Sequence, residues 1–259
     1  MAERDLVSST DAARTLGVST ATIKRWADAG VLPSIRTAGR HRRFDPHALE
    51  DFRRRQGGGR TQSWVGELLA VDDVRRMEAL LLQQRATSGS WWKVADALDV
   101  AMLELRARWR AGTVMLLDLR LAQERLQRAL AHLAEWIPQR ADAPRALLAL
   151  AEGESRMLPL SLVELCLREA GWNTLWLGAG VPMSVVARAG HTQRLDMIVV
   201  AASETGRAEP LAAQAALLGR ACRLQHLQLV LVGRGAWPQH PPHGRTLRSC
   251  AEVHTHLTS

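Results

Sequence analysis

The sequence contains no tyrosine, two phenylalanines and three cysteines among its 259 residues. Cys166, Cys222 and Cys250 lie far apart and form no Cys-x-x-Cys or Cys/His spacing, so they predict reduced thiols, with Cys166 buried on a helix. No stretch approaches the roughly 20 uninterrupted apolar residues that a membrane-spanning helix requires, and the first residues lack the apolar core of a signal peptide. We therefore expect a cytoplasmic protein with no membrane partner.

Positive charge is abundant. The formal net charge is +8, which favours a polyanionic partner such as DNA. Apolar residues make up 47% of the chain, which is enough for substantial cores, and 259 residues suit two or three compact units.

The stretch from Leu6 to Phe52 has the pattern of a helix-turn-helix. Ser8, Ser9 and Thr10 offer N-cap hydroxyls to a short helix that ends near Leu16, and Gly17-Val18 makes the corner. On the second helix, capped by Ser19, Ile23 and Trp26 repeat at helical spacing and should face the core. That leaves four residues to reach base edges and phosphates, namely Thr20, Thr22, Lys24 and Arg25.

A basic hairpin follows this second helix. Gly30 and Pro33 stop the helix, and a loop with Gly39 at its tip leads back to the core at Phe44. The loop is suited to lie along a phosphate backbone as a wing, through the side chains of Arg40, His41, Arg42 and Arg43. A basic loop is often only a solvated surface, but that alternative does not account for the capped helices.

The words IKRWADAGVLPSIRTAGRHRRFD resemble the MerR family of winged-helix regulators, and are most similar to its short-wing branch with the CarH-like regulators. In CarH-like proteins a four-helix bundle and a Rossmann-like domain enclose adenosylcobalamin, and light breaks its carbon–cobalt bond to change the oligomeric state and release DNA. The resemblance thus implies a winged helix-turn-helix, a bundle and a B12-binding-like domain in this order.

The rest of the chain divides in a compatible way. Gly57-Gly58-Gly59 predicts a linker at 57–60 after a DNA-binding domain at 1–56. Residues 61–140 predict a four-helix bundle, with a first helix at Trp64 capped by Ser63. Residues 141–259 alternate apolar runs with helices and predict a parallel Rossmann-like α/β domain. Its expected elements include a helix at Met183–Ala189 and a last strand at Val253–Leu257.

The resemblance also locates the cofactor site, and its signature is altered. The family's Asp-x-His-x-x-Gly motif, whose His ligates cobalt and whose Gly admits the nucleotide tail, aligns with Glu154 to Pro159, so that Arg156 replaces the His. A guanidinium has no lone pair to give a metal. The family's Ser-x-Leu aligns with Ala201-Ala202-Ser203 and its Gly-Gly with Gly233-Arg234-Gly235. In the bundle Trp109 is kept, but the following Glu-His is Leu119-Arg120.

The sequence therefore predicts a fold kept without cobalamin, and no metal site. The residues expected to line the former cofactor cleft are Trp109, Arg120, Arg156 and Ser203. Two alternatives stay open for this cleft: larger side chains fill it, or it holds another flat ligand such as haem or a bilin. In the second, Trp109 stacks on the ligand and Arg120 or Arg156 pairs with its propionates. His132 and His191 are expected at the surface or hydrogen-bonded, and Trp91, Trp92 and Trp136 in core or domain contacts.

The function predicted is a dimeric or larger sequence-specific DNA-binding transcription regulator that needs no cofactor. Its C-terminal domains would serve self-association and input from a small-molecule or protein effector. A cobalamin-dependent enzyme subunit is the third alternative. It needs a metal ligand and acid–base groups that the sequence does not offer, and it leaves the helix-turn-helix unexplained, so we expect no enzymatic activity.

Overall fold

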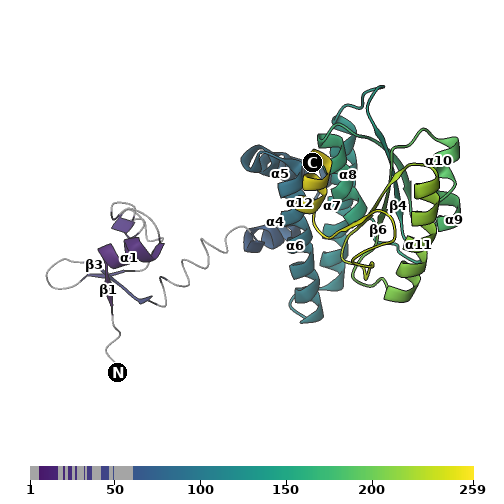
Figure 1. Cartoon of the computed structure of the whole chain (residues 1–259). Coiled ribbons are helices and arrows are strands. Elements are labelled where there is room, and N and C mark those ends of the chain that lie inside the picture. Colours follow the sequence, from purple (N-terminus) through teal and green to yellow (C-terminus); the bar gives the residue numbers. More distant parts are fainter. Residues whose placement is uncertain are drawn as a thin grey trace. The chain divides into compact units, whose positions relative to one another are not determined.

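The computed structural model describes residues 6–16, 20, 23–24, 27, 32, 34–36, 42–46, 49 and 61–259. The chain forms two compact units, Met1–Trp64 and Val65–Ser259 (Figure 1). Each unit has its own hydrophobic core. None of the helices in the described ranges is long and apolar enough to cross a lipid bilayer.

The described part of the first unit holds one helix and a small antiparallel sheet. Its elements are β1 (Val7–Ser8), α1 (Ser9–Leu16), β2 (Ile35–Arg36) and β3 (Arg42–Phe44). The sheet has the order β1-β3-β2. Six buried side chains form the core, namely Ala12, Ala13, Ile23, Leu32, Phe44 and Leu49. The predictions that Ile23 and Phe44 face the core are therefore confirmed.

Four helices follow: α4 (Thr61–Ala70), α5 (Val74–Ser88), α6 (Trp91–Arg110) and α7 (Leu116–Trp136). The predicted start at Trp64 is wrong, because Thr61 and Gln62 are compatible with a helix and Ser63 lies inside α4. Asp73 caps α5 by accepting the N–H of Arg76 at 2.9 Å, and Gly89 ends it in the left-handed conformation that glycine adopts without strain.

The remaining residues form a five-stranded parallel sheet with the order β5-β4-β6-β7-β8. The strands are β4 (Arg145–Leu150), β5 (Asn173–Gly178), β6 (Met197–Ala201), β7 (Gln228–Val232) and β8 (Arg245–Leu247). Numbered from β4 this is the doubly wound order 2-1-3-4-5, so the chain changes direction between β4 and β6. Ligands of such sheets bind outside the carboxyl ends of the two strands at that point.

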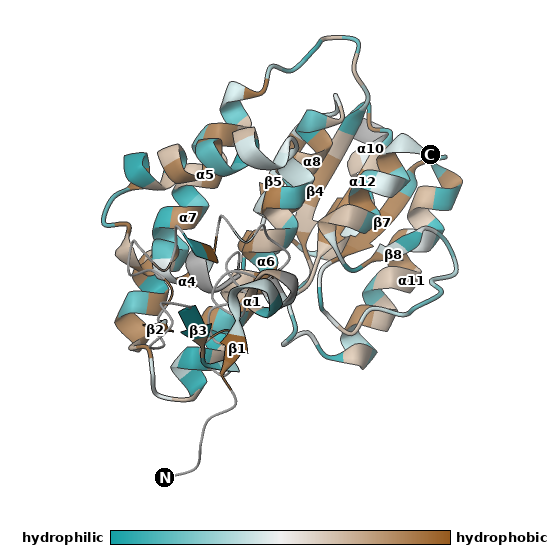
Figure 2. Cartoon of the chain, turned by 90° about the vertical axis from the view of Figure 1, so that its left-hand side faces the viewer, coloured by the Kyte–Doolittle hydropathy of each residue, from teal (hydrophilic) through white to brown (hydrophobic). Residues whose placement is uncertain are grey.

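Helices cover both faces of this sheet (Figure 1). One face carries α8 (Leu158–Glu169) and α12 (Cys250–Thr258), while the other carries α9 (Met183–Val186), α10 (Ala189–Thr192) and α11 (Ala208–Leu224). Because both faces are covered, the three central strands β4, β6 and β7 are largely apolar, and β4 and β7 appear brown in Figure 2. The helices α6 and α7 pack against α8, so residues 65–140 and 141–259 belong to one compact unit.

Two expected elements of this region are wrong. The predicted strand at Val253–Leu257 is the helix α12, because Ser249 caps it by accepting the N–H of Glu252 at 3.1 Å, in a Ser-x-x-Glu capping sequence. The predicted single helix at Met183–Ala189 is two short helices, α9 and α10. The amide of Gln225 donates to the Ala187 carbonyl oxygen at 2.8 Å, which occupies that carbonyl at the break.

The expected tryptophan positions are confirmed for two of the three. Trp91 is buried, and the Trp92 ring stacks on the His254 imidazole with centroids 5.1 Å apart. Trp136, by contrast, is 65% exposed at the end of α7, so its expected place in a core or domain contact is wrong. Pro138 lies two residues beyond α7, and a proline disfavours helical backbone at the residue before it, so α7 ends at Trp136.

Candidate functional site

The first helix of the helix-turn-helix is fixed by its cap. The Ser8 hydroxyl accepts the N–H of Asp11 at 3.2 Å and donates to the Asp11 carboxylate at 2.6 Å. This satisfies a backbone donor that the start of α1 leaves open, and the acidic side chain suits the positive end of the helix. Of the three predicted capping hydroxyls, Ser8 is the one that makes this bond.

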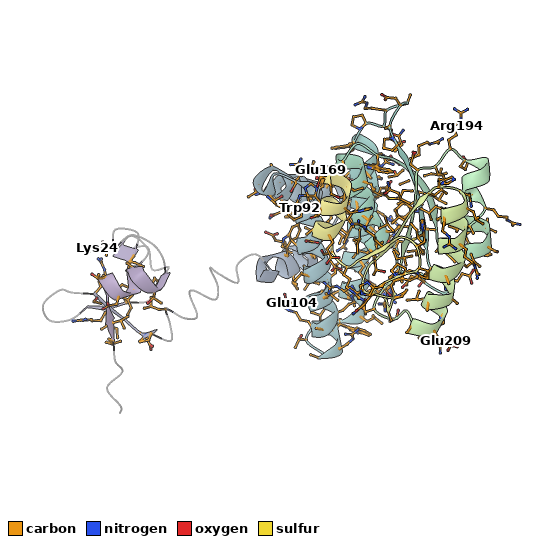
Figure 3. The ribbon with its side chains drawn as sticks, in the orientation of Figure 1. Lys24, Trp92, Glu104, Glu169, Arg194 and Glu209 are labelled. Atoms are coloured by element: carbon orange, nitrogen blue, oxygen red, sulfur yellow. The ribbon has the colours of Figure 1, made fainter. Side chains whose placement is uncertain are left out.

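The segment predicted to read DNA has a buried and an exposed side. Ile23 is fully buried in the first core and Ala27, four residues later, packs against the same core. Thr20 and Lys24 are exposed, and Figure 3 labels Lys24 on this unit. Exposed residues beside a buried apolar stripe are what a recognition helix requires. The other two predicted contacts, Thr22 and Arg25, lie outside the described residues.

The strands on either side of the predicted basic loop pair antiparallel. Arg36 lies opposite Arg42 and Ile35 opposite Arg43, while Arg40 and His41 lie outside the described residues. Side chains alternate along a strand, so Arg42 shares a face with the buried Phe44 and Arg43 lies on the opposite face. Both arginine side chains are partly exposed.

A second candidate site lies at the carboxyl ends of β4 and β6. Glu154 follows β4, and its carboxylate accepts the backbone N–H groups of Ser155 and Arg156 at 2.9 Å each and that of Ser203 at 2.7 Å. Burial alone would raise the pKa of this carboxyl, but the hydrogen bonds from Ser203, Arg156 and Ser155 outweigh burial and lower the pKa below its usual value. Glu154 thus ties together the loops that follow the two strands.

Glu204, next to Glu154, accepts hydrogen bonds from two arginines and has a third, Arg110, at 4.0 Å. Its Oε1 accepts Nη1 of Arg106, from α6, and Nη1 of Arg156, each at 3.0 Å. The Arg106 side chain is 10% exposed and its Nε also donates to the Met102 carbonyl oxygen at 3.2 Å. Burial lowers the pKa of Arg106 and Glu204 opposes that shift, so the group stays charged at neutral pH. One carboxylate therefore joins the helical region to both strand-end loops.

A cleft of about 550 Å³ opens beside this ion cluster, between α7 and the loop from β4 to α8. Of the four residues predicted to line it, Arg120 and Arg156 do so, and the sequence reasoning missed Arg106. Arg106 comes one turn before Trp109 on α6, so helical spacing could have suggested it. The predicted lining is wrong for Trp109, which is 38% exposed at the end of α6, and for Ser203.

Ser203 lines a separate, much smaller cavity. This cavity measures about 30 Å³ and lies between α8, α12 and the ends of β6 and β7, with Pro159 and Gly233 also in its wall. Its volume is on the order of that of one water molecule. Pro159 lies in the first turn of α8, where its missing N–H costs no helical hydrogen bond.

The described part of the chain contains no cluster of three or more His, Cys, Asp or Glu side chains that could hold a metal ion. All three cysteines are free, as predicted; Cys166 is buried on a helix, as expected, and Cys222 and Cys250 are also buried. Burial raises the pKa of Cys222 to about 11, which leaves its thiol protonated at neutral pH. His132 lies at the surface and pairs with Glu78 at 2.6 Å, as predicted, whereas the side chain of His191 lies outside the described residues.

Residues 6–57 match the family model of the helix-turn-helix domain. This match supports binding to DNA. No curated protein matches the chain significantly. Among solved structures, the chain is similar to the monomethylamine corrinoid protein of Methanosarcina barkeri, with 16% identity and a TM-score of 0.50 over 67% of this chain and 85% of that one. At this identity the likeness shows the fold alone, a cobalamin-binding-like α/β architecture.

Two further structures are reported at a TM-score of 0.38. One is the methanol:cobalamin methyltransferase complex of Methanosarcina barkeri, with 18% identity over 62% of this chain and 63% of that chain. The other is a cobalamin-binding protein of Desulfitobacterium hafniense, with 15% identity over 76% of this chain and 97% of that chain.

Proposed function

We propose that this chain is a sequence-specific DNA-binding transcription regulator of the MerR type, CarH-like in organisation but independent of cobalamin. The observation that carries the proposal is the helix-turn-helix match at residues 6–57, joined to a unit with a cobalamin-binding-like fold. The exposed Thr20 and Lys24 beside the buried Ile23 support a reading helix, and the antiparallel pairing of β2 with β3 supports a wing.

Cobalamin independence is supported by the poor fit of the residues at the carboxyl ends of β4 and β6. Arg156 stands where the family places its cobalt ligand, and its guanidinium is held by Glu204. The cavity beside Pro159 and Ser203, about 30 Å³, is far too small for a nucleotide tail. Arg120, in place of the His of the family's upper cap, lines the same cleft as Arg156.

The haem or bilin alternative receives less support from the cleft. Its lining is largely polar, whereas a flat tetrapyrrole buries two apolar faces. Met157 is the one sulfur ligand among the lining residues, and no histidine or cysteine of the described ranges joins it. An enzymatic role has no support from a metal cluster or a reactive thiol in the described residues.

Self-association of the C-terminal region is part of the proposal. Helix-turn-helix proteins commonly read two half-sites as dimers. At the start of α7, the N-cap residue Met115 and the first two helical residues, Leu116 and Leu117, are 70%, 49% and 63% exposed. A run of exposed large apolar side chains is typical of a surface that another molecule covers.

DNA binding is tested by fluorescence anisotropy with the DNA upstream of the protein's own gene, against unrelated DNA of equal length. The proposal expects tighter binding to the upstream DNA at fixed salt, together with retention of that preference in excess competitor. Equal affinity for both DNAs at every salt concentration would contradict sequence-specific regulation. Sedimentation velocity on the same preparation measures the oligomeric state.

A further inference from the structure

The cleft between α7 and the loop from β4 to α8 has the volume and lining of a small-molecule site. Its volume of about 550 Å³ lies within the range of ligand pockets, roughly 300 to 1,000 Å³. Arg106, Arg120 and Arg156 converge on it from α6, α7 and the loop after β4. All three elements belong to the second unit, so the cleft is formed by one compact body.

The charge of the cleft is unbalanced. Glu124 is the one carboxylate that lines it, against three arginines, and Glu124 already pairs with Arg128 at 3.0 Å. Glu204, next to the cleft, offers one oxygen to both Arg106 and Arg156. A guanidinium carries five N–H donors in a fork, so most donors of these arginines are not used by Glu204.

Arg120 is the least satisfied of the three. Its side chain is exposed to the cleft, and it makes no hydrogen bond or ion pair with any residue that the structure describes. Gln123 and Gln127 follow it at helical spacing and line the same cleft, so one face of α7 presents a cation and two amides. Ser155, on the opposite wall, adds a hydroxyl.

We propose that this cleft binds a small organic anion that carries phosphate or carboxylate groups. Arginine forks bind both groups through paired hydrogen bonds, and the amides and hydroxyl suit the polar remainder of a metabolite. The cleft exceeds the size of a single inorganic anion, so the ligand carries its charge on a larger polar body. The proposed anion binding does not depend on DNA binding. Any effect of the bound anion on DNA affinity would rest on the proposed function as a DNA-binding regulator.

The test is calorimetric titration of the full chain, without DNA, with inorganic pyrophosphate in one arm and citrate in the other, at constant ionic strength. We expect saturable binding in at least one arm, and the stronger arm identifies phosphate or carboxylate chemistry. Arg120→Gln should weaken that binding by about tenfold or more, because a charge-assisted hydrogen bond is lost from an exposed side chain. Arg156→Lys keeps the positive charge but loses the planar set of guanidinium N–H donors, so it should also weaken binding of the anion.

Arg75→Gln is the matched control. Arg75 is an exposed arginine on α5 without a described partner, and its loss removes the same charge without touching the cleft. This control also subtracts anion binding by other basic groups of the chain. Absence of saturable binding in both arms, or equal weakening by Arg120→Gln and Arg75→Gln, would overturn the proposal. A failure of DNA binding would leave these titrations unchanged, so the two proposals fail separately.

Discussion

Arg156 carries a guanidinium in the loop after β4, at the position where the family that the sequence resembles has a cobalt-ligating histidine. The sequence shows the arginine at this position, but it does not predict the carboxylate that binds it. Glu204 is 48 residues further along the chain and meets Arg156 only because β4 and β6 are neighbours in the sheet. Residue spacing predicts contacts within one helix or loop. It cannot predict an ion cluster whose members come together only through the order of the strands in the sheet.

Arg156→His tests whether the absence of a histidine at this position alone would account for the proposed cobalamin independence. We expect the variant, purified from cells supplied with adenosylcobalamin, to show no corrin absorption in the visible range. The reason is that Pro159 and the cavity of about 30 Å³ still obstruct a nucleotide tail. Retention of cobalamin by Arg156→His would show that the ligand was the one missing part.

Glu154→Gln tests the tie between the two strand-end loops. The pKa of Glu154 lies below its usual value of 4.5, so the ionised carboxylate contributes stability above that pH and loses it as the pH falls through the lower folded-state pKa. The glutamine side chain has an NH₂ group in place of one carboxylate oxygen. That NH₂ group cannot accept a hydrogen bond from the backbone N–H groups that Glu154 binds. We expect a loss of about 1–3 kcal/mol in the free energy of unfolding at pH 7, shrinking below pH of about 4.5.

Urea unfolding from neutral to acidic pH measures this dependence. Glu135→Gln is the control, because Glu135 is exposed on α7 and has no partner among the described residues. It should change the unfolding free energy by a few tenths of a kcal/mol at most, about the range of a neutral surface substitution. A loss in Glu154→Gln that stays constant down to low pH would mean that the carboxylate charge contributes nothing.

Lys24→Ala tests the reading helix at the level of one side chain. Lys24 is exposed beside the buried Ile23, so its ammonium is free to reach a base edge. We expect the variant to lose about 1–3 kcal/mol of discrimination at one operator position. The measurement is affinity for a panel of single-base operator variants at fixed salt. A uniform loss across the panel would reassign Lys24 to a phosphate contact.

At the scale of the element, the long apolar patterns predicted the structure well. The runs that contain β4, β6 and β7 are buried on both faces, so apolar sequence and strand coincide. Short polar elements were harder to predict. The sequence pattern missed β8, Arg-Thr-Leu, because three residues are too few to show a period and the strand is specified by pairing with β7.

A strand was expected at Val253–Leu257, whereas the structure has α12, and the two apolar residues of that segment are spaced as on one face of a helix. Two contacts decide for the helix. Ser249 caps its first turn, and Asp96 of α6 accepts the N–H of Cys250 at 2.6 Å and that of Ala251 at 3.3 Å. The Ser249-x-x-Glu252 spacing was present in the sequence as a helix-start signal, but the contribution of Asp96 depends on packing between distant segments.

The hairpin of β2 and β3 yields a prediction at the same scale. Arg43 lies on the face of β3 opposite to the buried Phe44, so it is placed to contact phosphate without disturbing the core. Arg43→Ala should weaken binding to all DNA sequences alike and reduce the slope of log affinity against log salt by about one unit. Anisotropy titrations over a range of salt measure the slope, with Arg75→Ala as the matched loss of charge. A changed base preference at intact affinity would contradict a wing.

At the scale of the whole molecule, the chain joins a helix-turn-helix unit to a unit with a cobalamin-binding-like fold. Arg106, from α6, and Arg156, after β4, meet on Glu204, so the helices and the sheet share one ion cluster at the expected ligand position. We expect a ligand bound beside this ion cluster to affect both the helices and the sheet of this unit. Composition and the motifs of the sequence predicted the two parts, but not the ion cluster that links them.

The most direct test of the account is a DNA-binding titration of the full chain with its upstream DNA, with and without adenosylcobalamin, in the dark and in the light. The account predicts four superimposable curves and no corrin absorption in the protein recovered after gel filtration. Tighter or weaker DNA binding that depends on adenosylcobalamin, together with cobalamin retained by the protein, would contradict it.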